Sequence, residues 1–258
     1  MSLQPIAGMI SGLRKSIEFV TAGVGQLIWP AVCLNCGSAI GEIGGELCGS
    51  CWQQIQSCVG GEYCTRCGRE GTGYAALAGG CPSCQGQEIS FDGIARGGIY
   101  ANAMQRMILA LKSSRSELDS VLGFLAEGAL AGGGLGGEID FFVPVPLHWR
   151  RRLLRGYNQS MLLAKMLKAS KGKINTELVR IRHTKRQPMT ASAAQRRANV
   201  AGAFAVRRGH KFAGHNICLV DDIKTTGATL NECARVLKHA GASKVFALVL
   251  AVAGQQAG

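Results

Sequence analysis

Four C-x-x-C pairs between residues 33 and 84 constrain the fold of this chain more than any other feature. Each pair can form a tight turn that points two thiolates at one metal ion, and two such turns supply the four soft ligands of tetrahedral Zn²⁺. Eleven residues separate the first two pairs and thirteen separate the last two, which predicts a tandem repeat of one unit. The predicted ligands are Cys33, Cys36, Cys48 and Cys51 for one ion, and Cys64, Cys67, Cys81 and Cys84 for the other.

Disulfides and a redox site are the alternatives to zinc. Disulfides are disfavoured because no secretory signal is expected, and a redox site needs one reactive pair rather than four. All the ligands are thiolates, so both predicted sites are structural, and the spacing leaves a cross-braced pairing open. Gly37 and Gly68 each follow a leading pair, where the turn favours a positive φ. Cys58 is expected to be a free thiol, and Cys218 and Cys233 lie in apolar patterns typical of a core.

The charge of the chain changes sign along its length. Residues 1–95 hold seven acids and four basic residues, whereas 150–211 hold 17 basic residues and one acid. Such an excess opposes compaction, so a polyanion is the expected partner: nucleic acid, a phosphorylated metabolite or an anionic membrane. A surface that only contacts solvent is the alternative to a binding surface.

The 47% hydrophobic content excludes a disordered chain. No long uncharged apolar stretch is present, so no membrane span and a cytoplasmic location are expected.

The apolar pattern predicts three segments along the chain. Residues 1–30 form an amphipathic helix that packs on its own protein, with a membrane-surface anchor as the alternative. Residues 31–90 form a double zinc ribbon, and residues 91–254 form an α/β domain with a mostly parallel sheet, because predicted strands and helices alternate there. The predicted strands are 94–100, 141–145, 178–181, 217–220 and 245–252, and the predicted helices are 102–112, 116–130, 157–169, 191–199 and 228–240.

A strand at 217–220 is followed by Asp221 and Asp222 and then by a loop rich in Thr and Gly that opens a helix. The backbone N–H groups of 225–229 are expected to bind an anion at this helix N-terminus, which Gly227 lets approach closely. Two carboxylates repel a phosphate unless they meet hydroxyls or a metal ion, conditions that a ribose diol and Mg²⁺ satisfy. The Walker and Rossmann patterns are absent, and an ordinary capped turn is the alternative.

This segment resembles the signature of type I phosphoribosyltransferases: four apolar residues, two acids, two further residues, then T-T-G-x-T. The resemblance implies that Asp221 and Asp222 hold the ribose hydroxyls of phosphoribosyl pyrophosphate (PRPP). It also implies a 5′-phosphate loop made of Thr225, Thr226, Gly227, Ala228 and Thr229.

Other segments are similar to the ComF competence-protein family, which also begins with cysteine pairs in this arrangement. Lys224 is a departure, because the family usually has an apolar or small residue at this position. The resemblance implies a phosphoribosyltransferase fold behind a double zinc ribbon and a role in natural transformation, with single-stranded DNA and DNA-uptake helicases or processing proteins as partners. The similar segments are Val143–Leu147, Arg150–Arg152, Arg155–Gln159, Leu111-Lys112 with Arg115, and Thr184 with Gln187, Arg196, Asn199, Ala203 and Phe204.

Phosphoribosyl transfer needs cations at the leaving pyrophosphate and a nucleophile placed near C1′ of the ribose. Lys112, Arg155 and the turn after Pro146 are the candidates for binding pyrophosphate with Mg²⁺, and the basic segment 182–199 is a predicted lid. The sequence does not identify the acceptor of the phosphoribosyl group.

One alternative function is that of a non-catalytic protein that binds single-stranded nucleic acid through residues 150–211 and the ribbons, mainly by phosphate contacts. Another is a PRPP-sensing regulator.

Overall fold

The computed structural model describes residues 31–40, 45–74, 77, 79–111, 116–133, 135, 139–167, 170–184 and 192–254. The helix predicted within residues 1–30 and the candidate Lys112 lie outside these ranges. The chain divides into two compact units, Met1–Trp52 and Gln53–Gly258. The first cysteine quartet belongs to the first unit, whereas the second quartet shares a unit with the central sheet. The boundary predicted between residues 90 and 91 lies inside the second unit and stays a prediction.

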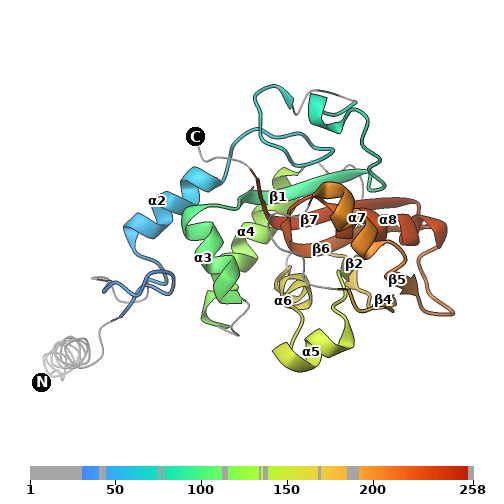
Figure 1. The fold of residues 1–258 in the computed structure, drawn as a ribbon. Coiled ribbons are helices and arrows are strands. Elements are labelled where there is room, and N and C mark those ends of the chain that lie inside the picture. Colours follow the sequence, from blue (N-terminus) through green and yellow to red (C-terminus); the bar gives the residue numbers. More distant parts are fainter. Residues whose placement is uncertain are drawn as a thin grey trace, which may run out of the picture. The chain divides into compact units, whose positions relative to one another are not determined.

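A five-stranded parallel sheet organises the second unit, with the strand order β1-β7-β6-β2-β3 (Figure 1). Strand β7 is buried over its whole length after Lys244, as is typical of a parallel sheet covered on both faces. The predicted α/β class with a mostly parallel sheet is confirmed. The sheet strands are β1 (Gly93–Ile99), β2 (Phe141–Pro144), β3 (Lys173–Ile174), β6 (Asn216–Lys224) and β7 (Lys244–Val252), and an antiparallel pair is formed by β4 (Leu178–Arg180) and β5 (Phe204–Val206).

Helices cover the sheet. Helices α4 and α6 pack against each other and on the strands β1, β7, β6 and β2, while α8 packs on β6 and β7 and on the β5 strand (Figure 1). None of the helices in the described part of the chain has the length and apolar content needed to cross a bilayer. The helices are α2 (Gly49–Cys58), α3 (Asn102–Leu111), α4 (Asp119–Gly132), α5 (Trp149–Arg155), α6 (Gln159–Met166), α7 (Ala193–Val200) and α8 (Ala228–His239), with 3₁₀ turns at Pro82–Cys84 and Ser116–Leu118.

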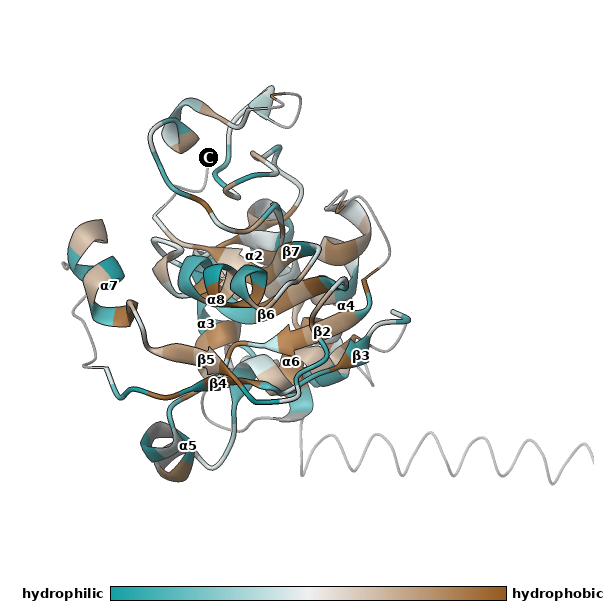
Figure 2. Cartoon of the chain, turned by 90° about the vertical axis from the view of Figure 1, so that its right-hand side faces the viewer, coloured by the Kyte–Doolittle hydropathy of each residue, from teal (hydrophilic) through white to brown (hydrophobic). Residues whose placement is uncertain are grey.

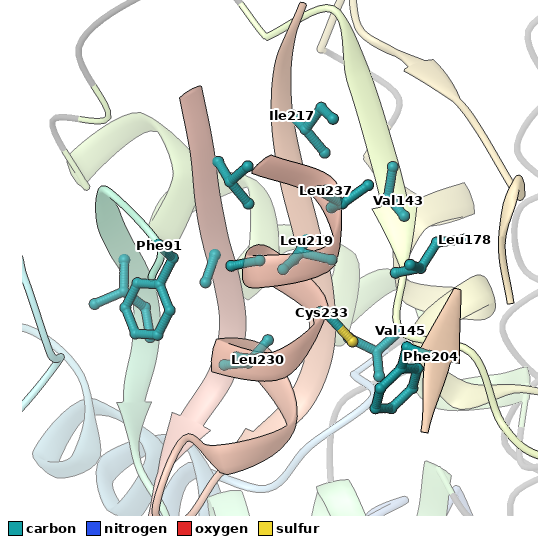
Figure 3. Close-up of a cluster of buried hydrophobic side chains, with 14 of the residues drawn as sticks. Phe91, Val143, Val145, Leu178, Phe204, Ile217, Leu219, Leu230, Cys233 and Leu237 are labelled. Atoms are coloured by element: carbon teal, nitrogen blue, oxygen red, sulfur yellow. The ribbon is translucent and has the colours of Figure 1, made fainter. Parts of the chain in front are cut away.

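One hydrophobic core of this unit lies between the sheet and α8, as Figure 3 shows. Ile217 and Leu219 of β6 meet Leu230 and Leu237 of α8, and each of these side chains is at most 1% exposed. Burial of one such side chain contributes about 1.5–3 kcal/mol, so this contact holds α8 firmly against β6. The predicted core positions of Cys218 and Cys233 are confirmed, since neither is exposed. Outside this contact α8 turns hydrophilic residues outward (Figure 2).

Two elements near the predicted site differ from the sequence expectation. Strand β6 does not end at Val220 but continues through both acids to Lys224, because the ladder with β7 extends as far as the Lys224–Val252 pair. Helix α5 was not expected, since four of its seven residues are arginines. His148 begins it by accepting a hydrogen bond at Nδ1 from the backbone N–H of Arg150, and Gly156 ends it with φ +78°.

Candidate functional site

Both cysteine quartets have the geometry of a tetrahedral metal site. The four sulfur atoms of each quartet lie within 4.8 Å of one another, in the sequential grouping rather than the cross-braced one. Tetrahedral Zn²⁺ with Zn–S bonds near 2.3 Å separates its sulfurs by about 3.8 Å. The structure has 3.7 Å between Sγ of Cys36 and Cys48 and 3.6 Å between Sγ of Cys67 and Cys81. The residues therefore fit two structural zinc ions, each held by four thiolates.

The two ribbons repeat the same turn in detail. The N–H of Gly37 donates to the Cys33 carbonyl over 2.8 Å, and the N–H of Gly68 donates to the Cys64 carbonyl over 2.7 Å. Both glycines have φ +77°, which confirms the predicted left-handed turn. The ribbons differ in burial, because the second quartet is wholly buried while Cys36 of the first is exposed.

The second ribbon is buried because it packs on the sheet of its own unit. The N–H of Ile94 at the start of β1 donates to the Thr65 carbonyl over 2.8 Å. A Cβ at Gly68 would stand 3.1 Å from Val252 Cγ2, so the turn touches the end of β7. Arg96 of β1 lies 4.7 Å from the ring of Tyr63 and 3.7 Å from Glu70. The ribbon thus packs along β1, from Ile94 at its start to Arg96, and also touches the end of β7.

The loop between β6 and α8 has the form expected of an anion site. Gly227, with φ +78°, immediately precedes Ala228, the first residue of α8. The Thr226 hydroxyl accepts a hydrogen bond of 3.4 Å from the N–H of Ala228, while Thr225 and Thr226 are exposed. Backbone N–H groups at a helix N-terminus favour a negatively charged ligand.

This loop encloses a cavity of about 180 Å³, called here the phosphate cavity. Three cationic side chains line it: Arg180, Arg196 and Lys224. Arg180 donates to the Thr184 hydroxyl and stands 5.1 Å from the Phe204 ring, so its guanidinium is oriented before any ligand arrives. The full lining consists of Arg180, Thr184, Arg196, Asn199, Val200, Asp221 and residues 223–230.

Asp221 belongs to the wall of the phosphate cavity, whereas Asp222 does not. The Ser160 hydroxyl donates to Asp221 Oδ1 over 2.9 Å, and the N–H of Asp222 donates to the same oxygen over 3.0 Å. Loss of water around Asp221, together with the neighbouring charge of Asp222, raises the pKa of Asp221 to about 8. The charge of Asp222 also adds to the burial that raises the pKa of Tyr100. The two acids are thus coupled electrostatically although only one faces the cavity.

The other predicted site residues are placed less directly. Lys112 is outside the described residues, as are 185–191 of the predicted lid. Arg155 is the last residue of α5. The side chains that follow it form hydrogen bonds to the backbone of distant segments. The Tyr157 hydroxyl donates to the Leu111 carbonyl over 2.6 Å, and the Asn158 amide donates to the Val145 carbonyl over 3.1 Å. Sequence reasoning did not single out Arg180 as a site residue, because one arginine in a three-residue strand gives no pattern.

Helix α5, at the start of the basic segment 150–211, presents an aromatic and apolar patch. Trp149 is 58% exposed and Leu153 is 75% exposed, and both border a shallow hollow of about 410 Å³. The Arg150 guanidinium lies 5.2 Å from the Trp149 ring. The rings of His148 and His183 lie 5.0 Å apart.

Two family models match the chain. The model described as a double zinc ribbon domain matches residues 24–87, and the model described as a phosphoribosyl transferase domain matches residues 156–258. The first covers both cysteine quartets, and the second covers the phosphate loop.

Individual proteins are similar over most of the chain. "Competence protein F" of Haemophilus influenzae is 31% identical over 220 residues, which are 83% of this chain and 93% of that protein. "DNA utilization protein YhgH" of Salmonella typhi is 29% identical over 226 residues, 85% of this chain and 96% of that protein. Among solved structures, glutamine PRPP amidotransferase from B. subtilis is 19% identical over 55% of this chain and 30% of its own length, with a TM-score of 0.36.

Proposed function

Because this chain belongs to the ComF competence-protein family, we propose that it binds PRPP with Mg²⁺ at the phosphate cavity and transfers the phosphoribosyl group to an acceptor. The observation that carries this proposal is the phosphate cavity itself. It combines a helix N-terminus, three cationic side chains and Asp221 in about 180 Å³. These are the groups that a phosphorylated ribose requires.

In this proposal each group of the site has a separate task. The N–H groups of residues 225–229 and the Thr hydroxyls bind the 5′-phosphate, while Arg180 and Arg196 add positive charge. Asp221, in the wall of the cavity, holds the ribose hydroxyls and so fixes the direction of C1′. Asp222 lies outside that wall and acts on Asp221 through its charge, and the ribose contact that the resemblance implies for Asp222 stays a prediction. Mg²⁺ bound with PRPP supplies charge neutralisation for the departing pyrophosphate. Lys112 and Arg155 are proposed to bind that pyrophosphate.

Titration calorimetry of PRPP with Mg²⁺ into the zinc-loaded protein tests this function. The double variant Asp221→Ala/Asp222→Ala is expected to lose binding by at least about tenfold, because one hydrogen bond to a charged group contributes about 1.5–3 kcal/mol. Glu117→Ala, which removes an exposed acid outside the cavity, is the matched control. Absence of PRPP binding by the folded wild type would reject the proposal. Release of pyrophosphate in the presence of an acceptor would separate an enzyme from a PRPP-sensing regulator.

We propose DNA handling in natural transformation as the setting of this activity, on the support of the names of the relatives. A second candidate function is the binding of single-stranded nucleic acid on the α5 surface. The exposure of Trp149 beside Arg150 favours it, since an aromatic ring next to a cation can stack a base and attract a phosphate. DNA-uptake helicases or processing proteins are the proposed protein partners.

A further inference from the structure

A second and larger cavity, of about 1070 Å³, lies between the second zinc ribbon and the carboxyl ends of β1, β6 and β7. Arg69 and Gln87 line it from the ribbon, Tyr100 from the end of β1, and Arg197 from α7. It is called here the ribbon cavity. Nothing in the proposed binding of PRPP accounts for a space of this size.

The ribbon cavity adjoins the phosphate cavity. Five residues line both spaces and form a shared wall between them: Arg196, Ile223, Lys224, Thr225 and Thr226. A molecule in the ribbon cavity therefore lies next to the ligand of the phosphate loop. This is the relation that two substrates of one transfer reaction require.

The walls of the ribbon cavity are held in place by contacts on either side of it. Asn231 of α8 donates to the Glu88 carbonyl over 2.9 Å, and its side-chain oxygen accepts from the N–H of Ser90. These two bonds fix the chain that leaves the ribbon to the helix that begins at the phosphate loop. Opposite them, Gly68 of the ribbon packs on Val252 of β7. The cavity is therefore preformed, as small-molecule sites commonly are.

The chemistry of the lining favours a planar, anionic molecule. Tyr100, Ile223 and Val252 supply an aromatic ring and two branched aliphatic side chains. Arg69 and Arg197 are exposed on the two sides of the space. An aromatic ring fits against the apolar residues, and an arginine pairs with a carboxylate or phosphate in a fixed, bidentate geometry.

We propose that the ribbon cavity binds the acceptor, an aromatic nitrogen heterocycle that carries a carboxylate, with Arg69 of the zinc ribbon as its anion ligand. This inference rests on the proposed function. In the transfer, the lone pair of a ring nitrogen forms the bond to C1′ while the C1′–O bond to pyrophosphate breaks. Both electrons of that bond leave with the pyrophosphate, and a nitrogen that carries hydrogen loses its proton to water.

Paired probes that differ only in charge test the proposal. Pyridine-3-carboxylate, pyridine-2,3-dicarboxylate and uracil-6-carboxylate are each titrated into the zinc-loaded full chain, beside the corresponding amides. The titrations are run with and without PRPP and Mg²⁺. At least one acid is expected to bind tenfold or more tightly than its amide, and more tightly when PRPP is present.

Two arginines of the second ribbon supply the matched variants. Arg69→Gln is expected to weaken the binding of the acid at least fivefold and to leave its amide and PRPP unchanged. Arg66→Gln is the control, because Arg66 is exposed on the same ribbon, bonds to the Gly79 carbonyl and does not line the cavity. Zinc content is measured for both variants, so that damage to the metal site is separated from loss of the anion ligand.

The outcomes distinguish this inference from the proposed function. If PRPP binds but none of the three acids does, the acceptor proposal is rejected and the phosphate cavity stands. Equal binding of an acid by the Arg69→Gln and Arg66→Gln variants also rejects it. If the wild type binds no PRPP, the proposed function fails first and the acceptor proposal falls with it.

Discussion

The side chain of Lys224 lies against Gly227, with its Cε atom 3.0 Å from the position that a Cβ would take there. Lys224 is the last residue of β6, and Gly227 is the residue before α8. The stem of the lysine thus crosses the phosphate loop and rests on its glycine. Lys224 lines both the phosphate cavity and the ribbon cavity, and Cys67 of the second quartet also lines the ribbon cavity.

The Gly227→Ala variant is expected to lose PRPP affinity and stability together. A Cβ there meets the Lys224 stem, and a left-handed conformation costs a non-glycine residue about 1–2 kcal/mol. Gly209→Ala is the control, because Gly209 has φ +74° and open space around its Cβ position. Both variants should lower the melting temperature, but only Gly227→Ala should weaken PRPP binding. Equal PRPP affinity in the two variants would contradict the assignment of the loop.

The Lys224→Met variant is expected to weaken PRPP binding by about tenfold or more, because a hydrogen bond to a charged group contributes about 1.5–3 kcal/mol. Methionine keeps most of the stem that rests on Gly227 and removes the charge. Lys244→Met, at the exposed start of β7, removes a lysine outside both cavities. Calorimetry of PRPP should separate the two variants. If the Lys224 ammonium only contacts solvent, the Lys224→Met and Lys244→Met variants will bind PRPP with equal affinity.

The pKa of Asp221 predicts a pH dependence of stability. The folded chain keeps this proton up to about pH 8, whereas the unfolded chain loses it near the ordinary value of 3.8. The stabilisation from Asp221 is therefore complete below about pH 4 and is lost as the pH rises to about 8. Denaturant midpoints at pH 6 and pH 8.5 should fall more for the wild type than for Asp221→Asn. Parallel slopes for the two proteins would refute the raised pKa.

The Asp222→Asn variant gives an independent check on the same group. The charge of Asp222 is the second cause of the shift, after the loss of water around Asp221. Its removal should lower the pKa of Asp221 without restoring the ordinary value, as followed by ¹³C NMR of the carboxyl carbon. An unchanged pKa would mean that the two acids are not coupled.

Loss of zinc is expected to have different effects in the two ribbons. Cys64→Ser should lower the melting temperature of the sheet-containing unit, because the second ribbon is bonded to β1 and packed on β7. Cys36→Ser affects a quartet that belongs to the other compact unit, so the melting of the sheet-containing unit should stay unchanged. Metal analysis with differential scanning calorimetry measures both effects. A similar fall in both variants would show that the ribbons act as one body.

The proposed binding of single-stranded nucleic acid on the α5 surface can be tested separately. Trp149→Ala should weaken the binding of single-stranded DNA by about 1–3 kcal/mol, the usual contribution of one stacked base. Trp52→Ala is the control, since Trp52 is also partly exposed but lies on α2. Binding should also fall steeply with salt, because phosphate contacts release counterions. Fluorescence anisotropy at several salt concentrations measures the DNA affinity of each variant and its dependence on salt. An affinity that does not change with salt would exclude binding through phosphate contacts.

The sequence was sufficient to predict the parts of this chain that rest on local patterns. The spacing of the cysteine pairs predicted both quartets, and the apolar runs 217–220 and 245–252 predicted the central strands. The loop from Asp221 to Thr229 was recognised because its residue types have few other uses in that order. Each of these signals lies within a short stretch of chain, so no long-range contact was needed to detect it.

What the sequence did not predict depends on pairing and packing between distant segments. The continuation of β6 to Lys224 is set by its partner β7, whereas the aspartates themselves disfavour a strand. Arg180 reaches the phosphate cavity because β4 pairs with β5. The residues near Arg180 in the sequence do not predict this strand pairing. The attachment of the second ribbon to the sheet was missed for the same reason.

That attachment has a consequence for the order in which the chain assembles. The second ribbon and β1 leave the ribosome early, yet the hydrogen bond from the N–H of Val245 to Asp92 joins residues 153 positions apart. The contacts within the ribbon are short-range and form quickly, whereas β1 must wait for β7, which follows the other strands of the sheet in the chain. A ribbon already closed around zinc then holds the start of β1, through Thr65 and Ile94, until its partner strand arrives. We therefore expect that withholding zinc during synthesis lowers the yield of native protein.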